Sequence, residues 1–301
     1  MTSVRLRRRA AVSGAALAAA LLVAAPAPAA PPATAPAATA APAAPSAAPA
    51  PAPAARTLTV IAHRGASAAA PENTLVAGEV ARRAGVEWIE NDVRPSRDGV
   101  PYVVHDATVD RTTDGSGAVR SLTSARLDAL DAGSWFAPAF AGARVPTLAA
   151  QLADLRTRGG RLLLEVKGPH SRAEVARIVR DVREQRMTDR VVVQSFDPAS
   201  LRYVRELAPE LPRALLRDRL DADPVAVARE LGLAAYNVSD AALSARPGAV
   251  AELRAAGVAV NVWIVDDPAR WRALAGLGVD GVITDRPAEL VGWNAARAGA
   301  R

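Results

Sequence analysis

The chain of 301 residues contains no cysteine and only one lysine, Lys167. The absence of cysteine excludes disulfides and a thiol nucleophile, so the folded part must be held together by its hydrophobic core. No Gly-rich phosphate-binding motif follows the first apolar run, and no serine nucleophile motif is evident. Because every other basic residue is arginine, position 167 must either need something that arginine lacks or hold its lysine by chance.

The first 55 residues differ from the rest of the chain. An uncharged, Ala-rich run over 10–25 follows a positive cluster, and small residues at 27–29 offer a cleavage site. We predict a signal peptide over 1–30, with an uncleaved anchor as the alternative, and an Ala/Pro-rich linker over 31–55. The globular part is then 56–301. The export signal predicts a secreted or extracytoplasmic protein of the cell envelope. The positive cluster consists of Arg5, Arg7, Arg8 and Arg9.

The net charge of +6 includes these four arginines, and 1–30 contains no acidic residue, so the mature chain would be near +2. That charge is too small to indicate nucleic-acid binding, and no Arg-rich run is interleaved with aromatic residues. We expect no stable membrane span in the mature chain. Nothing in the sequence indicates an oligomeric state.

Short apolar runs alternate with amphipathic stretches along the globular part. Nearly continuous apolar runs are typical of parallel strands buried on both faces. Eight strand-helix units in about 245 residues predict a TIM barrel, with an open doubly wound sheet as the alternative. The eight predicted strands are 58–63, 86–92, 161–167, 191–196, 213–218, 233–239, 258–265 and 278–285.

One further apolar run, 100–106, follows the second predicted strand too closely for a parallel crossover. Asp98-Gly99 is a hairpin-turn signal, so we predict a hairpin over 93–105. Residues 106–146 would then form a small insertion over the barrel mouth, before a helix that opens at Pro146-Thr147.

Acidic residues cluster at the ends of two predicted strands. Glu90 and Asp92 share one face of their strand, as do Glu165 and Lys167 of the next. Active sites of TIM barrels lie at these carboxyl-terminal ends. Three converging carboxylates would repel one another, so we predict one divalent cation, Ca²⁺ or Mg²⁺, which prefer oxygen ligands. The alternative is ordinary salt bridges with arginine.

Two of the three histidines fall at the same mouth. His63 ends the first predicted strand and His105 ends the returning arm of the hairpin, whereas His170 lies in a later loop and is predicted to be peripheral. Imidazole titrates near neutral pH and serves as a general acid or base. Together with the positive charge of Arg64 and Lys167, this set suits a phosphate ester as substrate.

These residues lie in stretches that resemble the glycerophosphodiester phosphodiesterase family over essentially all of 58–288. The stretches include AHRGASAAAPENT, IENDVRPSRDGVPYVVHDATVDRTTDGSG, LLLEVK, VVVQSFD and GVDGVITDRP, in the family's order. The resemblance implies a TIM barrel with an insertion. It assigns His63 and His105 to catalysis, Glu90, Asp92 and Glu165 to the metal, and Arg64 and Lys167 to the phosphate.

The implied reaction is hydrolysis of a small glycerophosphodiester to glycerol 3-phosphate and an alcohol. The attacking oxygen may come from the substrate in this family, giving a cyclic phosphate first. Trp263 could pack on the glycerol or the leaving group, or could be a barrel-core aromatic. Asn91 stands where the family commonly has Leu or Met, and it is expected to face away from the site.

Three other functions are alternatives to this one. The first is a phospholipase D-type enzyme that acts on lysophospholipids or sphingolipids with the same site, which a large apolar rim in the insertion would favour. The second is a silent binding protein, which would lack one of the expected site residues. The third is a sugar-hydrolysing barrel, which would leave the two histidines and Lys167 without a role.

Overall fold

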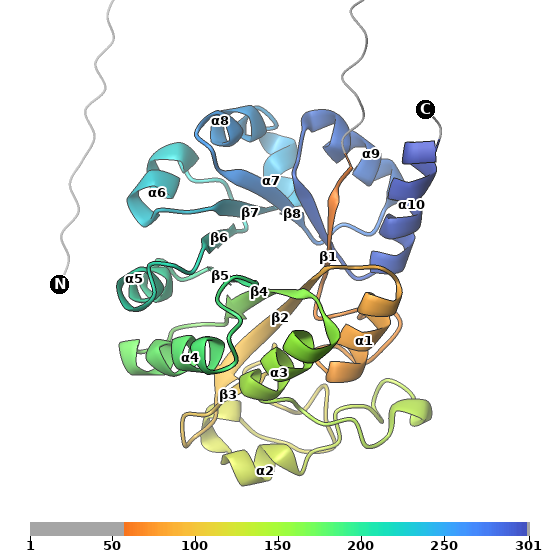
Figure 1. Ribbon diagram of the computed structural model, residues 1–301, viewed down its shortest axis with the longest axis vertical. Coiled ribbons are helices and arrows are strands. Elements are labelled where there is room, and N and C mark those ends of the chain that lie inside the picture. Colours follow the sequence, from red (N-terminus) through yellow and green to blue (C-terminus); the bar gives the residue numbers. More distant parts are fainter. Residues whose placement is uncertain (1–56, 300–301) are drawn as a thin grey trace, which may run out of the picture. The chain divides into compact units, whose positions relative to one another are not determined.

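The computed structural model describes residues 57–299, so the predicted signal peptide and linker lie outside the described residues. Eight parallel strands form a closed ring, because β1 pairs with both β2 and β9 (Figure 1). This confirms the TIM barrel and excludes the open sheet. A ninth strand, β3, lies outside the ring. The strands are β1 (Thr59–Ala62), β2 (Trp88–Pro95), β3 (Pro101–Val103), β4 (Arg161–Val166), β5 (Val191–Ser195), β6 (Arg213–Arg217), β7 (Ala235–Ser239), β8 (Ala259–Trp263) and β9 (Gly281–Thr284).

Helices surround the ring, and most begin at a side-chain cap. Thr147 accepts a hydrogen bond from the Ala150 amide, and Ser171 forms a capping box with Glu174. The helices are α1 (Leu75–Arg83), α2 (Ser124–Asp128), α3 (Leu148–Arg158), α4 (Arg172–Glu184), α5 (Pro198–Leu207), α6 (Pro224–Leu231), α7 (Asp240–Ala245), α8 (Ala249–Ala255), α9 (Pro268–Leu277) and α10 (Pro287–Gly299).

The main core lies between the ring and the helices. On β4, Leu162 and Leu164 are fully buried and belong to this core, whereas Leu163 belongs to a small separate cluster with Ile61 and Ile283. Strand side chains alternate between faces, so Glu165 follows Leu163 toward the barrel axis. The same alternation on β2 directs Glu90 and Asp92 inward.

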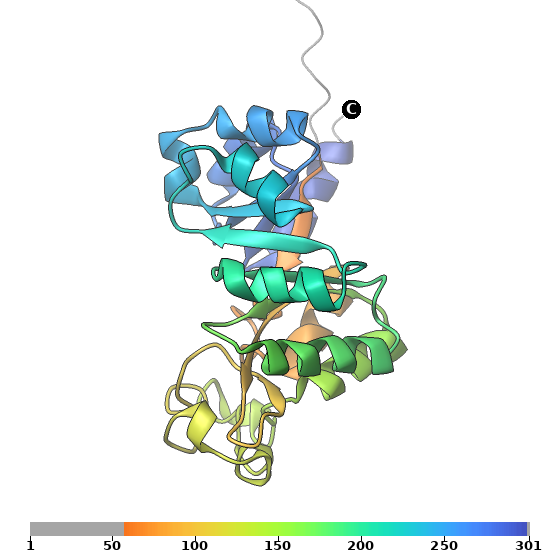
Figure 2. The same ribbon diagram turned by 90° about the vertical axis from the view of Figure 1, so that its left-hand side faces the viewer.

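The hairpin and the segment 106–146 project from one side of the ring (Figures 1 and 2). β3 pairs antiparallel with the end of β2, in a register that places Val93 opposite Val103. The segment contains α2 and two short 3₁₀ helices, Val119–Ser121 and Pro138–Phe140. It has its own small apolar cluster, formed by Tyr102, Val104, Val109, Val119, Leu127, Leu130, Ala132 and Val145.

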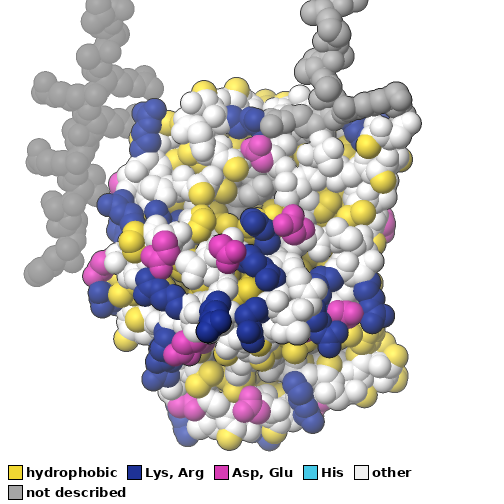
Figure 3. Space-filling view, in the orientation of Figure 1, with side chains coloured by type: hydrophobic (Ala, Val, Ile, Leu, Met, Phe, Trp, Pro, Cys, Tyr) yellow, Lys and Arg dark blue, Asp and Glu magenta, His cyan; other side chains and the backbone are white. Residues whose placement is uncertain are grey.

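The surface shows no field of a single charge on the face drawn in Figure 3, where Lys and Arg side chains are interspersed with acidic ones. Many of the described arginines are paired with a neighbouring acid, as Arg183 is with Glu210 at 2.7 Å. Among the described helices, none combines the length and the apolar character that a bilayer-spanning helix needs.

Candidate active site

The loop after β1 brings His63 and Arg64 to the mouth of the barrel. Arg64 and Gly65 both have positive φ angles, 54° and 83°. A Cβ atom at position 65 would lie 2.7 Å from the backbone carbon of Ala77 in α1, so the turn requires glycine there. This close approach packs the loop against α1 and fixes the direction in which His63 leaves the strand.

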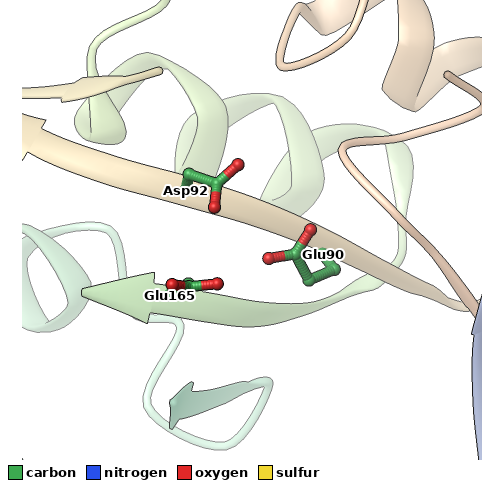
Figure 4. Close-up of side chains that lie close together, drawn as sticks. All are labelled: Glu90, Asp92 and Glu165. Carbon is green, nitrogen blue, oxygen red and sulfur yellow. The ribbon is translucent and has the colours of Figure 1, made fainter. Parts of the chain in front are cut away.

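Three buried carboxylates converge at the carboxyl-terminal ends of β2 and β4 (Figure 4). Glu90, Asp92 and Glu165 each offer an oxygen, and these oxygens lie within 4.8 Å of one another. Each residue is at most 5% exposed. Figure 4 shows the carboxylates pointing toward a shared space between the two strands.

Two cationic side chains border this cluster. Lys167 Nζ lies 2.9 Å from Glu165 Oε1 and 3.4 Å from Asp92 Oδ1, and Arg64 Nε lies 3.2 Å from Asp92 Oδ2. Lys167 forms an ion pair with Glu165 Oε1, but among the described residues no hydrogen bond of good geometry reaches this buried oxygen. A buried anionic oxygen without a donor, within an all-oxygen cluster, fits a hard divalent cation.

The pKa values of the three carboxyl groups are shifted in different directions. Burial and the charges of Asp92 and Glu165 raise the pKa of Glu90 well above its ordinary value. Burial, together with Asp92, raises the pKa of Glu165 to about 7. Burial would also raise the pKa of Asp92, but Lys167 and Arg64 bring it below its ordinary value. The site therefore disfavours three simultaneous negative charges unless further positive charge is present.

Asp92 is held in place through the loop before α1. Asn73, at a φ of 58°, donates from Nδ2 to Asp92 Oδ2 at 2.9 Å. Its Oδ1 accepts from the Asp92 amide at 3.2 Å and from Asn91 Nδ2 at 2.9 Å. The sequence indicated that Asn91 faces away from the site. Asn91 does not line the pocket, and its side chain donates to Asn73, the residue that orients Asp92.

Each of the two site histidines is oriented by its own carboxylate. His63 Nδ1 lies 2.6 Å from Asp285 Oδ1, and His105 Nδ1 lies 2.6 Å from Asp106 Oδ1. Hydrogen bonds from Arg111 and His105 hold the pKa of Asp106 below its usual range. Burial would raise the pKa of Asp285, but the hydrogen bond with His63 lowers it overall. An ionised carboxylate only accepts, so both Nδ1 atoms donate, and the Nε2 atoms are left for a substrate.

The insertion contributes Arg111 to this arrangement. Its guanidinium donates to both oxygens of Glu72, at 2.7 and 2.8 Å, and to Asp106 Oδ2 at 2.7 Å. Glu72 also accepts from Arg64 at 2.8 Å. Arg111 thereby links the loop after β1 to the carboxylate that orients His105.

These groups line a pocket of about 200 Å³ with a polar and an apolar side. Lys167 Nζ lies 5.7 Å from the ring centroid of Phe196, which packs edge-to-face on Trp263 with centroids 5.5 Å apart. Trp263 also donates to the backbone oxygen of Asn237 at 3.1 Å. The lining comprises His63, Arg64, Glu90, His105, Glu165, Lys167, Gln194, Phe196, Leu216, Asp218, Trp263, Ile264 and Ile283.

The structure gathers almost all of the predicted site residues around this pocket. Asp92 is not part of the lining, but it lies directly beside Lys167 and Arg64. His170 is 7% exposed, contacts the Gly168 carbonyl at 3.2 Å, and does not line the pocket. Arg64 reaches the pocket with its guanidinium already engaged by Glu72 and Asp92.

Sequence reasoning missed the residues that orient the histidines and carboxylates. Asp285 directly follows β9 and Asp106 directly follows His105 in the chain, so their positions were a usable signal. Gln194 is a polar residue inside an otherwise apolar run, which is a signal for burial, but the run gives no indication of the partner of its amide. Glu72 and Arg111 carried no such signal, because charged loop residues are common.

Three comparisons bear on this site. Residues 63–289 match the model of the glycerophosphoryl diester phosphodiesterase family. A glycerophosphodiester phosphodiesterase of Caldanaerobacter subterraneus is 35% identical over 235 residues, covering 77% of this chain and 96% of the relative.

Solved structures show the same likeness. An Oleispira antarctica phosphodiesterase in complex with the product sn-glycerol-3-phosphate superposes with a TM-score of 0.75 at 30% identity, covering 78% of this chain and 96% of the other. A glycerophosphodiester phosphodiesterase of Agrobacterium tumefaciens gives a TM-score of 0.70 at 36% identity, covering 78% of this chain and 99% of the other.

Proposed function

Because this chain belongs to the glycerophosphoryl diester phosphodiesterase family and is therefore a phosphoric diester hydrolase, we propose that it uses a divalent cation and two histidines to cleave small glycerophosphodiesters. The products would be glycerol 3-phosphate and an alcohol. The sn-glycerol-3-phosphate bound by the Oleispira relative supports this choice of product.

The matched pair of histidines is the observation that carries the proposal. Both face one pocket, and each has Nδ1 tied to a carboxylate at 2.6 Å, so each presents Nε2 as a proton carrier. One Nε2 removes the proton from the attacking hydroxyl or water. The other gives a proton to the alcohol oxygen as its bond to phosphorus breaks.

The two roles are assigned by the environment of His105. Burial, together with the charges of Arg64 and Lys167, lowers the pKa of His105 although Asp92 and Asp106 act to raise it, which favours the neutral form that accepts a proton. We therefore assign His105 as the base and His63 as the group that protonates the leaving alcohol.

Leaving-group chemistry tests this assignment. His63→Ala and His105→Ala should each lower turnover of glycerophosphoethanolamine by roughly 10²–10⁴-fold. A glycerol phosphodiester with a p-nitrophenolate leaving group needs little protonation, so it should restore much of the rate of His63→Ala and little of that of His105→Ala. His170→Ala is the control and should be near normal. Equal restoration in both variants would contradict the assignment.

Charge balance supports an anionic diester as substrate. With its three carboxylates ionised, the cluster and the two cations that border it, Lys167 and Arg64, carry one net negative charge. A divalent cation held by Glu90, Asp92 and Glu165 reverses the sign, and the single negative charge of a phosphodiester then brings it to neutrality. When bound, the cation would neutralise negative charge on the phosphate oxygens. Lys167, at the edge of the cluster, donates to the same oxygens.

Cation dependence is testable without assuming which ion is used. EDTA should abolish turnover, and either Ca²⁺ or Mg²⁺ should restore it. Glu90→Gln or Asp92→Asn should weaken cation binding, measured by calorimetry without substrate, because each removes a charged oxygen. Full activity in excess EDTA would refute the three-carboxylate site.

The alternative of lysophospholipids or sphingolipids is disfavoured by the insertion. Among the described residues, the large apolar side chains that are well exposed are Trp135, Ile264 and Leu277, and only Trp135 belongs to the insertion. A broad apolar rim for an acyl chain is therefore not present in the described part of the insertion. Turnover of lysophosphatidylcholine above that of glycerophosphocholine would favour the alternative.

We further propose that the enzyme acts outside the cytoplasm. The proposal is supported by the arginine cluster, the apolar run and the small residues of 1–30, followed by the Ala/Pro-rich 31–55. Export with cleavage near residue 30 should appear as a shortened amino terminus in the extracytoplasmic fraction. Retention of the full-length chain in the cytoplasm would contradict the proposal.

A further inference from the structure

A continuous chain of side-chain amides runs through the barrel interior from β8 to the carboxylate cluster. Asn261 Nδ2 donates to Asn237 Oδ1 at 2.9 Å, and Asn237 Nδ2 donates to Gln194 Oε1 at 2.8 Å. Gln194 Nε2 donates to Glu90 Oε1 at 3.2 Å. We call these three residues the amide chain.

The amide chain is buried where it meets the carboxylates. Gln194 and Asn237 are 1% and 0% exposed, and Glu90 is 2% exposed. Burial at this level keeps bulk water away from these amides, and each is satisfied by its neighbours in the chain. Asn261 is less buried and borders a second cavity of about 260 Å³ at the other end of the barrel interior.

The direction of the hydrogen bonds is fixed by chemistry. A primary amide has one donor end and one acceptor end, and Glu90 only accepts once it is ionised, as a ligand of a divalent cation must be. If Gln194 turned over, its oxygen would face the oxygen of Glu90, and its NH₂ would face the NH₂ of Asn237. Each amide thus prevents its neighbour from turning, and the series presents an N–H to Glu90.

Space for the far end of the chain is provided by Gly281, which stands opposite Asn261 in the β8–β9 register. A Cβ atom there would lie 2.4 Å from Asn261 Oδ1. At the near end, the second oxygen of Glu90 accepts from the Arg64 amide at 3.0 Å. Both oxygens of Glu90 are thereby held in place, and each retains a lone pair that can face the space shared with Asp92 and Glu165.

We propose that the amide chain is a positioning device for Glu90, and that Gln194, Asn237 and Asn261 set the affinity of the carboxylate cluster for its divalent cation. The inference rests on the proposed function, because it concerns the cation site assigned there. None of the three is a ligand: Gln194 acts on Glu90 directly, Asn237 acts through Gln194, and Asn261 acts through Asn237. Residues that orient a ligand commonly change metal affinity by 10–100-fold.

Cation binding in the absence of substrate is the primary measurement. Titration calorimetry with Ca²⁺ and with Mg²⁺ is applied to the unaltered protein and to two variants, Gln194→Met and Asn237→Leu. Each variant replaces one amide by an apolar side chain of similar size. Both variants should bind the cation roughly 10–100-fold more weakly. Asn261→Ala, at the less buried end, should show a smaller effect and keeps the test available if a buried variant fails to fold.

Activity measured against cation concentration separates positioning from damage to the fold. The cation concentration for half-maximal turnover should rise in parallel with the dissociation constant, and turnover at saturating cation should return to within a few-fold of the unaltered protein. The double variant of Gln194 and Asn237 should bind no worse than Gln194→Met alone, because Asn237 acts only through Gln194.

Gln151→Met is the matched control, because Gln151 is fully buried in α3 and its amide has no hydrogen-bond partner among the described residues. It should bind the cation normally. Normal cation affinity in folded Gln194→Met and Asn237→Leu would overturn the amide-chain proposal while leaving the proposed function standing. An unaltered protein that neither binds the cation nor hydrolyses the diester would overturn both.

Discussion

Replacing Lys167 by arginine isolates the geometry of one cation at unchanged charge. Lys167 leaves the end of β4 on the same face as Glu165 and is 16% exposed. Its ammonium stands 2.9 Å from Glu165, 3.4 Å from Asp92 and 5.7 Å from the centre of the Phe196 ring. A guanidinium is wider and planar, so it cannot occupy this space without moving its charge.

The magnitude follows from the distances. At an effective dielectric constant of about 20, unit charges 3.4 Å apart attract by about 5 kcal/mol, and separating them by about 1 Å more lowers this to about 4 kcal/mol. A similar loss at the substrate phosphate amounts to about 1 kcal/mol of transition-state binding. We therefore expect Lys167→Arg to lose at least roughly fivefold in kcat/KM, which corresponds to about 1 kcal/mol.

The assay is steady-state hydrolysis of glycerophosphoethanolamine at saturating cation, with thermal unfolding as the control. The Tm should stay within about 3 °C, because charge and most of the apolar stem are kept. Lys167→Met should be worse in turnover than Lys167→Arg, and it should bind the cation more tightly, since a positive charge beside the carboxylates is removed. Near-normal kinetics in Lys167→Arg would show that the single lysine is an accident of composition.

Four shorter predictions follow from other parts of the site. The raised pKa of Glu165, about 7, means that the folded metal-free protein binds a proton that the unfolded chain releases near its ordinary, lower pKa. This contribution to stability is present at low pH and lost as the pH rises through 7. Calorimetry in EDTA should therefore show that this group contributes more to the free energy of unfolding at pH 6 than at pH 8. Cation affinity should instead rise from pH 6 to pH 8, because fewer protons compete for the carboxylates; cation affinity independent of pH would contradict this. Asp285→Asn removes the charge that orients His63, and turnover should fall at least about tenfold with cation affinity unchanged; unchanged turnover would deny Asp285 a role. Gly65→Ala places a methyl group against α1 at a positive φ and should lower the free energy of unfolding by about 2 kcal/mol in denaturant titrations, and no change would show that the turn tolerates a side chain. Asp218 is exposed on the pocket lining, so Asp218→Asn should lower kcat/KM several-fold for glycerophosphocholine and leave glycerophosphoglycerol unaffected; equal effects on both substrates would contradict a charge-based preference.

The sequence predicted the barrel and most of its mouth because two simple regularities sufficed. Alternation of side chains along a strand places Glu90 with Asp92 and Glu165 with Lys167, and parallel strands bring their carboxyl ends to one edge. The Asp98-Gly99 turn then predicted that the chain returns beside β2. The returning strand is β3, which pairs with β2 so that Val103 lies opposite Val93.

The missed residues depend on which strands become neighbours and how loops fold over the mouth. Gln194 and Asn237 are 43 positions apart, and nothing local in either strand indicates that their amides meet. Arg111 could pair with many acids in the chain, and only the path of the insertion selects Glu72 and Asp106. Such partners follow from tertiary packing and leave no periodic pattern in the sequence.

The contact between His63 and Asp285 can form only late in the synthesis of the chain. His63 is near the start of the globular part and Asp285 near its end, 222 positions later, and the two meet only because β9 docks against β1. During most of its synthesis, the nascent chain contains His63 but not yet Asp285. A fragment truncated before β9 lacks Asp285 altogether. On the proposed mechanism, full turnover is expected only of a product that includes β9, and the appearance of activity during translation or refolding would time the docking of that strand.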